Sequence, residues 1–310
     1  MRVSARLFCL DTVMIDIVLR IARVPESGGD ILASEHLITT GGGYNAMSAA
    51  SRQGVSAVYA GRLGRGPFSS IARSSLVDDD VSEPIEADDQ LDAGFCVAMI
   101  DDGGERTFIT SSGAEANLRS SDLSSLDVRG GDYVLMSGYN VMYRESAPMV
   151  LEWLGGLGDD VVVAFDPSNR VADIPEENLL PVLERADWTL CNETEASLIT
   201  GEGSLEASVV ALAARTGRRG VIVRHGASGC TVLERHGVPV NVAAFPTTVV
   251  DTNGAGDTHS GVFLAELAMG TGVLEAAQRA NAASAVAISV LGPASCPERD
   301  VVTEMIWQRT

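Results

Sequence analysis

The sequence predicts an α/β protein of three layers, with a central, mostly parallel sheet flanked by helices and a small antiparallel β lid. Short apolar runs alternate with helical stretches along most of the chain, whereas two segments alternate single apolar and polar residues. The 310 residues, of which 45% are apolar, are enough for one large core. We therefore expect a single domain over residues 1–310, with lid strands from about 13–38 and 91–110.

The central sheet is expected from apolar and β-branched runs separated by helical segments, a pattern typical of parallel strands buried on both faces. These runs are Leu7–Leu10, Tyr133–Met136, Val161–Phe165, Trp188–Cys191 and Val221–Arg224. A connecting helix is expected from about Arg144 to Gly155. Asp166, Asn192 and Gly226 stand at or near the ends of three of these runs. Because ligands of parallel sheets bind outside the carboxyl ends of the strands, we expect the functional site there.

The lid is predicted from a hairpin pattern. Phe95–Ile100 and Arg106–Ile109 are strand-like runs joined by the turn Asp101–Gly104. Residues from Val13 to Ile38 show the same alternation of apolar and polar side chains. We expect these segments to form a small sheet separate from the central one.

Composition excludes several functions. The net charge of −20 argues against nucleic acid and anionic membranes as partners, because both are polyanions. All 22 basic residues are Arg, which removes mechanisms that need a lysine, such as the P-loop. The five cysteines have no C-x-x-C spacing, and no apolar run approaches the roughly 18 residues of a membrane span. We expect a cytoplasmic protein.

The strongest single signal is the stretch Asp-Thr-Asn-Gly-Ala-Gly-Asp from Asp251 to Asp257. We expect a strand to end at Asp251 and a helix to begin near Asp257. The amides of Gly254, Ala255 and Gly256 would then form an anion site at the helix N-terminus. A carboxylate beside such a site can take a proton from an alcohol while the amides stabilise a transferred phosphoryl group. The motif alone also permits a plain tight turn with Asp257 as the helix N-cap.

A second glycine cluster, Gly41–Gly43, precedes a helix rich in small residues. Its glycines permit close approach of a ligand to the backbone, and Asn45 offers both a donor and an acceptor. Taken alone, the cluster is as typical of an ordinary junction between a loop and a helix.

Together these motifs resemble the ribokinase or PfkB family of carbohydrate kinases. Asp251–Asp257 matches the family's D-T-x-G-A-G-D signature at every fixed position, and Asn192–Glu195 matches its N-x-x-E motif. Gly41 and Gly42 with Asn45 match its N-terminal signature more loosely. The resemblance covers almost the whole chain. It implies a ribokinase-like fold, ATP and Mg²⁺ as cofactors, and phosphorylation of a primary hydroxyl of a sugar or sugar-like molecule.

The resemblance also implies roles for single residues. Asp257 would be the catalytic base, with Gly254, Ala255 and Gly256 as the anion hole. Substrate would contact Asp16, Gly42, Gly43, Asn45 and Arg170, with Tyr139 and Asn140 as further pocket-lining residues. Nucleotide would contact Asn192, Arg224, Gly226 and Asn281; Glu195 would organise Mg²⁺; and Asp251, Asn253, Ala287 and Gly292 would surround K⁺. Ordinary structural roles stay open at several of these positions: a solvated helix residue for Glu195, a helix-surface amide for Asn281 and an ion pair with a nearby acid for Arg170.

Three departures from the family pattern leave the substrate open. No lysine stands beside Gly43, Gly66 stands where the family usually has Asp, and Arg224 stands where a nucleotide-contacting Thr is common. A nucleoside kinase of the same family and a non-catalytic sugar- or nucleotide-binding homologue are therefore alternatives. The resemblance also implies a homodimer through the lid, because lids of the family often pair across a dimer, and this would suit the exposed edge of a small sheet.

Overall fold

The computed structural model describes residues 5–103, 105–142, 146–216 and 218–308. Its main sheet has eight strands in the order β12-β11-β10-β9-β8-β7-β1-β4. The strands β10, β9, β8, β7, β1 and β4 run parallel to one another, whereas β11 and β12 pair antiparallel. The strands are β1 (Leu7–Leu10), β4 (Ala57–Tyr59), β7 (Tyr133–Ser137), β8 (Val162–Asp166), β9 (Trp188–Asn192), β10 (Gly220–Arg224), β11 (Cys230–Glu234) and β12 (Val240–Val242). The predicted parallel strands are thus confirmed.

One predicted strand is wrong. In the described part of the chain, residues 246–251 form no strand, and Val249 and Val250 are exposed. The amides of Val250 and Asp251 instead donate to the carbonyl of Ile288, at 2.8 and 3.2 Å. These bonds to the residue after α10 take the place of strand pairing for this segment.

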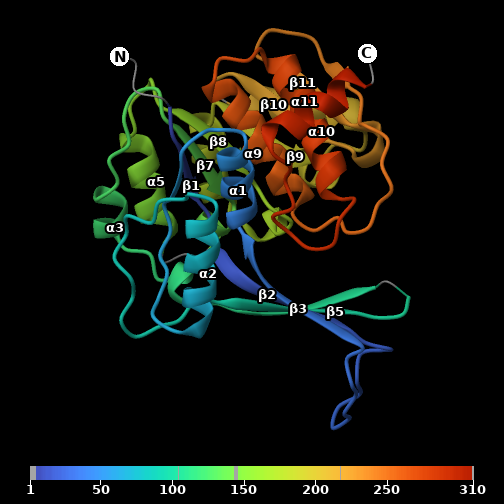
Figure 1. Ribbon diagram of the computed structural model, residues 1–310. Helices are drawn as coiled ribbons and strands as arrows, with labels where there is room; N and C mark the ends of the chain where they lie inside the picture. Colours follow the sequence, from blue (N-terminus) through green and yellow to red (C-terminus); the bar gives the residue numbers. More distant parts are fainter. Residues whose placement is uncertain (1–4, 104, 143–145, 217, 309–310) are drawn as a thin grey trace.

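Helices cover both faces of the main sheet (Figure 1). One face carries α1 (Tyr44–Arg52), α2 (Pro67–Asp78), α9 (Ala255–Ala268), α10 (Val273–Ala287) and α11 (Arg299–Trp307). The other carries α3 (Ser120–Ser124), α4 (Tyr139–Met142), α5 (Ala147–Gly156), α6 (Glu176–Arg185), α7 (Glu193–Thr200) and α8 (Leu205–Arg215). The helix predicted from about Arg144 is α5; residues 143–145 lie outside the described residues.

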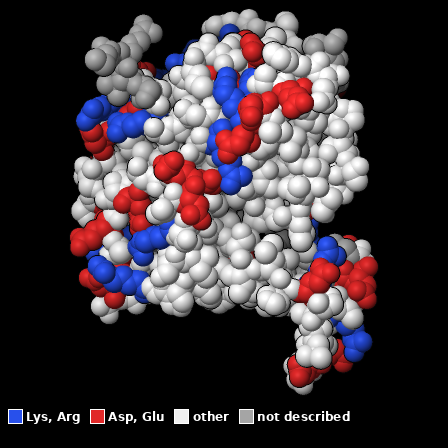
Figure 2. Space-filling model, in the orientation of Figure 1, with Lys and Arg blue, Asp and Glu red and all other residues white. Residues whose placement is uncertain are grey.

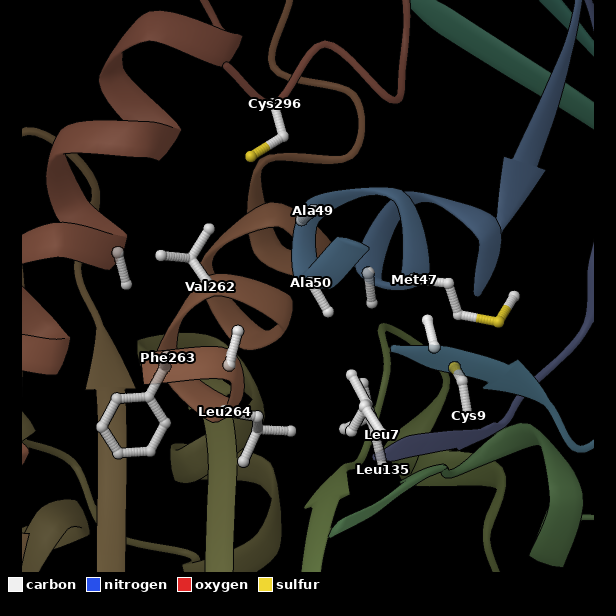
Figure 3. Close-up of a cluster of buried hydrophobic side chains, with 14 of the residues drawn as sticks. Leu7, Cys9, Met47, Ala49, Ala50, Leu135, Val262, Phe263, Leu264 and Cys296 are labelled. Carbon is white, nitrogen blue, oxygen red and sulfur yellow. The ribbon is translucent and has the colours of Figure 1, made fainter. Parts of the chain in front are cut away.

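Successive strand residues belong to two different cores, as a buried parallel sheet requires. In β1, Leu7 and Cys9 join the core under α1 and α9, whereas Phe8 and Leu10 join the core under the opposite helices. Figure 3 shows the first core, where α1 packs on α9 above the sheet. A Cβ on Gly261 would lie 2.2 Å from the carbonyl oxygen of Ala46, so the two helices cross closely. This crossing places the start of α1 beside the start of α9.

The lid is a separate sheet of four strands in the order β3-β2-β5-β6. They are β2 (Val13–Arg20), β3 (Glu35–Gly42), β5 (Phe95–Ile100) and β6 (Arg106–Ser111). The outer pairs are antiparallel, including the predicted hairpin of β5 and β6, and the central pair, β2 and β5, runs parallel. Figure 1 shows this sheet extending away from the body of the molecule. Since β2 follows β1 closely and β3 leads into α1, the base of the lid adjoins the carboxyl edge of the main sheet.

Basic and acidic side chains are intermixed on the face shown in Figure 2, with no continuous basic patch there. The five cysteines are free thiols, and four of them are buried. Within the described residues, no helix combines the length and apolar character that crossing a bilayer would need.

Candidate active site

Five adjacent strands end in polar residues at one edge of the main sheet. Asp11 follows β1, and Ser137, Asp166, Asn192 and Arg224 end β7, β8, β9 and β10. The strand register pairs Ser137 with Asp166, and Asn192 with Arg224. The predicted location of the site at the carboxyl ends of the strands therefore coincides with a row of polar groups.

The N-terminus of α9 lies against this row. Gly254 is the residue before the helix and has φ 72°, a left-handed conformation that favours glycine. The helix begins at Ala255, two residues before the predicted start, so Asp257 lies in its first turn and is not the N-cap. No side chain caps this helix end. The amide of Ala255 donates to the carbonyl of Thr252 at 3.3 Å, and the other amides of this uncapped first turn suit an anion site.

Asp257 is half-buried beside Asn45 of α1. The Nδ2 of Asn45 donates to Oδ2 of Asp257 at 3.0 Å. Burial raises the pKa of Asp257 to about 6, and the hydrogen bond from Asn45 opposes that rise. The Oδ1 of Asn45 is buried and has no partner among the described residues, and the residue is only 2% exposed. The two motifs that stand about 200 residues apart in the sequence meet here.

The N-terminal glycines approach the protein's own backbone. Gly42 has φ 66°, and a Cβ on it would lie 2.1 Å from the carbonyl oxygen of Thr12. The amide of Gly43 donates to that same oxygen at 2.8 Å. These contacts hold the start of α1 against the link between β1 and β2. The expectation that Gly42 and Gly43 contact a ligand stays a prediction.

Asp16 of β2 reaches the loop before α9. The Nδ2 of Asn253 donates to its Oδ2 at 3.5 Å. A Cβ on Gly41 would lie 2.2 Å from the same oxygen, so the glycine leaves room for the carboxylate. Burial raises the pKa of Asp16 to about 6. The base of the lid thus adds a second carboxylate near Asp257.

Arg224 forms a buried network at the end of β10. It donates to Asp166 at 3.2 Å, to the hydroxyl of Ser260 at 2.8 Å and to the carbonyl of Gly256 at 3.2 Å. The Ser260 hydroxyl also donates to Asp166, at 3.2 Å. Burial by itself lowers the pKa of Arg224, but Asp166 and Glu195 outweigh it and raise that pKa above its ordinary value. A guanidinium that stays charged therefore lies beside the first turn of α9.

Asn192 and Glu195 cap each other at the start of α7. The amide of Glu195 donates to the Asn192 side chain at 2.9 Å, and the amide of Asn192 donates to the Glu195 carboxylate at 2.8 Å. Glu195 is buried, so the solvated-residue alternative is wrong. Burial raises the pKa of Glu195, and the charge of Asp166 raises it further.

The group expected to hold K⁺ includes a carboxylate that is already paired. Asp251 accepts from Arg106 of the lid at 3.0 Å, from the amide of Asn253 at 3.0 Å and from the amide of Gly292 at 3.2 Å. The carbonyl of Ala287 accepts from Ser295 at 3.0 Å. Potassium binding stays a prediction, and the ion pair of Arg106 with Asp251 connects the lid to the loop before α9.

The other predicted residues have the following contacts. The hydroxyl of Tyr139 donates to Asn169 at 2.9 Å, and the amide of Asn140 donates to the carbonyl of Leu10 at 2.7 Å. Arg170 forms an exposed ion pair with Asp173 at 2.7 Å. The amide of Asn281 donates to the carbonyl of Val242 at 2.9 Å, from a buried position that contradicts the helix-surface alternative. Gly226 forms a turn after β10, with φ 62°. None of these contacts excludes a ligand role, which stays a prediction for each residue.

Sequence reasoning missed Asp11 and Ser260. Asp11 comes directly after the apolar run Leu7–Leu10, just as Asp166 comes after the run Val161–Phe165. This position at the end of a predicted strand was the signal that could have identified it. Ser260 lies about one helical turn beyond Asp257 in α9, after the end of the motif, and only the fold brings it to Arg224 and Asp166.

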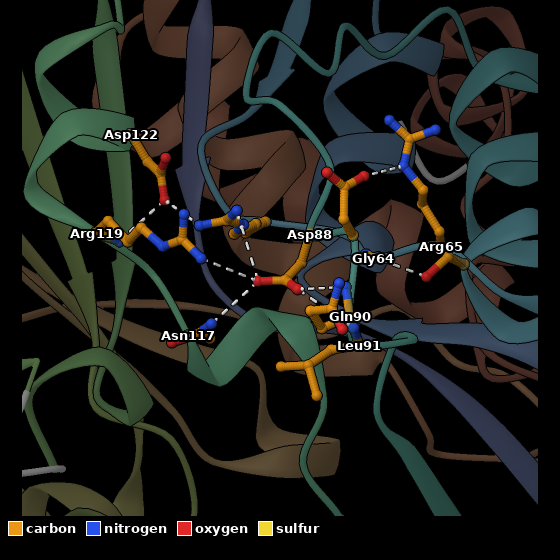
Figure 4. A network of polar contacts seen from close by, with 11 residues as sticks. Gly64, Arg65, Asp88, Gln90, Leu91, Asn117, Arg119 and Asp122 are labelled. Carbon is orange, nitrogen blue, oxygen red and sulfur yellow. Dashed lines mark hydrogen bonds and ion pairs between the residues drawn. The ribbon is translucent and has the colours of Figure 1, made fainter.

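Another carboxylate lies beside Gly66, the position where the family usually has Asp. The carboxylate of Asp92 accepts from the amides of Phe68 and Ser69, at 3.0 and 2.7 Å, at the start of α2. A Cβ on Gly66 would lie 2.4 Å from this carboxylate, so Asp92 occupies the space beside Gly66. Figure 4 shows the preceding loop, in which Asp88 accepts bonds from Gln90, Asn117 and Arg119.

The architecture and this edge define a phosphoryl-transferring enzyme of the α/β class, and comparison with known proteins identifies its family. Residues 4–300 match the model of the pfkB family carbohydrate kinases. The chain is 29% identical to the uncharacterized sugar kinase YegV of Escherichia coli over 93% of this chain and 89% of that protein. It is 27% identical to an ATP-dependent ribose-1-phosphate kinase of Halopiger xanaduensis over 95% of each chain. Among solved structures, ribokinase from Thermotoga maritima superposes with a TM-score of 0.84 at 22% identity, covering 98% of this chain and 99% of that one.

The chain therefore belongs to the pfkB family, and it is an ATP-dependent carbohydrate kinase. The predicted family and fold class are confirmed.

Proposed function

We propose that this kinase transfers the γ-phosphoryl group of ATP to a primary hydroxyl of a sugar or sugar-like alcohol, with Asp257 as the base. The observation that carries the proposal is a half-buried carboxylate in the first turn of α9, beside helix amides that no side chain caps. The first turn thus holds both a proton acceptor and donors for an anion.

The environment of Asp257 suits general base catalysis. With a pKa of about 6, the carboxylate is ionised at neutral pH yet more basic than an ordinary aspartate. Asn45 orients it through one carboxylate oxygen and leaves the other for the hydroxyl of the substrate. The amides of Gly254, Ala255 and Gly256 would stabilise the charge of the phosphoryl group in transit.

The phosphate side fits ATP with Mg²⁺. Arg224 supplies a fixed positive charge, and Asn192 and Glu195 present oxygen atoms, which Mg²⁺ prefers as ligands. No group of three or more metal-binding side chains occurs in the described residues, which suits an ion held mainly through water and phosphate oxygens. When bound, Mg²⁺ neutralises charge that develops on the phosphates. Gly226 and Asn281 would contact the nucleotide at the neighbouring strand ends.

Replacement of the base tests the proposal. Asp257→Asn keeps the shape of the side chain and should lower kcat by roughly 10²–10⁴-fold, the usual contribution of a general base. Nucleotide affinity, measured by calorimetry, should stay near the wild-type value. Asp159→Asn, at an exposed site before β8, is the matched control and should keep full activity. Near-normal turnover in Asp257→Asn would refute this assignment of the base.

The acceptor is identified by ADP release across sugars and nucleosides, with and without K⁺. Turnover with sugars alone supports the proposal, whereas turnover with nucleosides alone makes the protein a nucleoside kinase. The same preparation gives the oligomeric state, for which we propose a dimer through the exposed strands of the lid.

A further inference from the structure

The substrate side of the site is built from hydrogen-bond acceptors. The carboxylates of Asp16 and Asp257 and the unpartnered Oδ1 of Asn45 all lie around the start of α1 and α9. The nearby side-chain amides each already donate at least one N–H: Asn45 Nδ2 to Asp257, Asn253 Nδ2 to Asp16, and Asn140 Nδ2 to a backbone carbonyl. Acceptors therefore outnumber the remaining side-chain donors here, and a ligand that brings donors of its own suits this side best.

Asp11 adds a third carboxylate to this side. It lies at the end of β1, where a Cβ on Gly43 would come within 2.7 Å of its Cβ and 3.3 Å of its Cγ. Its Oδ1 accepts from the amide of Thr12 at 2.7 Å, and the side chain of Ser137 also bonds to it. The charge of Asp257 acts on Asp11 strongly enough to be the second cause, after burial, of its raised pKa. Asp11 thus lies close to both the N-terminal glycines and the base.

These three carboxylates form no ion pair in the described part of the chain, whereas Asp166 pairs with Arg224 and Asp251 pairs with Arg106. The charge of Arg224 reaches Asp257 without an ion pair and only partly opposes the rise in the pKa of that carboxyl. Buried carboxylates of like charge repel one another unless protons or a ligand relieve the repulsion. Hydroxyl donors relieve it in part, and an ammonium group relieves it more. A carboxylate or phosphate on the ligand makes it worse.

We propose that Asp11 is a specificity-determining residue that makes the acceptor site select substrates by charge. The site takes polyhydroxylated molecules that are neutral, favours those that carry an ammonium group, and rejects sugar acids and sugar phosphates. This inference rests on the proposed function, because it assumes that the acceptor binds between Asp11, Asp16 and Asp257. It separates this chain from relatives whose acceptor is itself phosphorylated.

The test uses substrates that share one skeleton and differ in one group. Ribitol, 1-amino-1-deoxyribitol and ribonate form one set, and D-glucose, D-glucosamine and D-gluconate form another. Each member is measured at constant ionic strength by ADP release and, separately, by the dissociation constant from calorimetry. In the wild type, the amine should exceed the neutral member, and the acid should be weakest. Asp11→Asn should reduce the ratio of amine to acid by roughly ten- to hundredfold, the effect of one nearby charge in a partly buried site. Asp159→Asn, which removes the same charge from the far edge of the sheet, should leave the ratio unchanged.

The outcomes separate this inference from the proposed function. ADP release with a ratio that Asp11→Asn does not change overturns the role of Asp11 and leaves the kinase reaction intact. Binding in the expected order without ADP release from any member supports charge selection and counts against the proposed acceptors. An acid that binds the wild type as tightly as the amine overturns the inference, whether or not the variant folds.

Discussion

The two sides of the N-terminus of α9 balance their charges differently. On the phosphate side, Arg224 is half-buried against Asp166 and Ser260, so one carboxylate already has its counter-ion. On the substrate side, Asp11 and Asp257 accept hydrogen bonds from neutral groups and form no ion pair within the described residues, although the charge of Arg224 still acts on Asp257. In this chain without lysine, the guanidinium pairs on the side where an anion should bind, and it only partly opposes the raised pKa of the base.

This difference gives each side a distinct chemistry. A cation paired directly with the base would lower the pKa of Asp257 further than Arg224 does and weaken it as a proton acceptor. A carboxylate without a cation beside the triphosphate would repel it. The two sides meet at Gly256. Its carbonyl accepts a hydrogen bond from Arg224, and the next residue, Asp257, is the proposed base.

The largest effect predicted here is that of removing the positive charge of Arg224 from the phosphate side. Arg224→Gln should lower kcat by roughly 10²–10³-fold, comparable with the loss of one donor in an anion hole. The dissociation constant of the sugar should change much less. Steady-state kinetics with separate titrations of ATP and sugar measure both quantities.

A second variant tells this role from a purely structural one. Arg224→Gln alone also leaves Asp166 buried without its partner, which lowers stability. The double variant Arg224→Gln with Asp166→Asn removes both charges and should regain much of the lost stability. If its activity also returns to near wild type, Arg224 only neutralises Asp166.

On the substrate side, Asp11 has no ion pair within the described residues, so its ionisation should lower the free energy of unfolding in a way that depends on pH. Burial, and next the charge of Asp257, raises the pKa of Asp11 from 3.8 to about 7. Between these two values the native state binds more protons than the unfolded state, so the free energy of unfolding falls as the pH rises. Above pH 7 the cost is complete. Asp11→Asn should therefore raise the free energy of unfolding by about 2–4 kcal/mol at pH 8.

Urea denaturation at two pH values measures this cost. At pH 5 the advantage of Asp11→Asn over the wild type should shrink by about half or more, because part of Asp11 is then protonated in the native state. Asp159→Asn, at the exposed site, should change the free energy of unfolding by less than about 0.5 kcal/mol at both values. An equal gain from Asp11→Asn at both pH values would mean that packing, and not charge, explains it.

Two parts of the phosphate side could be predicted from the sequence because they are local, whereas the contacts of Arg224 with Asp166 and Ser260 join separate elements and could not be. The glycines before α9 and the reciprocal cap of Asn192 and Glu195 each lie within one short motif, where spacing alone fixes which groups can meet. The predicted parallel strands were also correct, since buried parallel strands form continuous apolar runs.

The substrate side was harder to predict because its contacts are long-range. Asn45 and Asp257 meet only because α1 crosses α9, and Asp16 meets Asn253 only because the base of the lid lies against the loop before α9. Asp11 carried no motif at all. The strand predicted to end at Asp251 failed for a related reason: apolar β-branched residues indicate a strand, but only the fold shows that bonds to Ile288 take the place of strand pairing.

The smallest expected effect concerns the ion pair of Arg106 with Asp251, which links the lid to the loop before α9. Arg106 of β6 contacts Asp251 at 3.0 Å and is about a third exposed, so the pair should contribute no more than about 1 kcal/mol. Arg106→Ala should therefore lower kcat/KM for the sugar by about fivefold at most. It should also raise ADP release in the absence of sugar, because a lid that closes less often excludes water less well. Arg106→Lys, which keeps the charge, should show a smaller change in both measurements. If Arg106→Ala leaves sugar-independent ADP release and kcat/KM at their wild-type values, this ion pair has no part in closing the lid, and the boundary between the two sides is set within the main sheet and α9 alone.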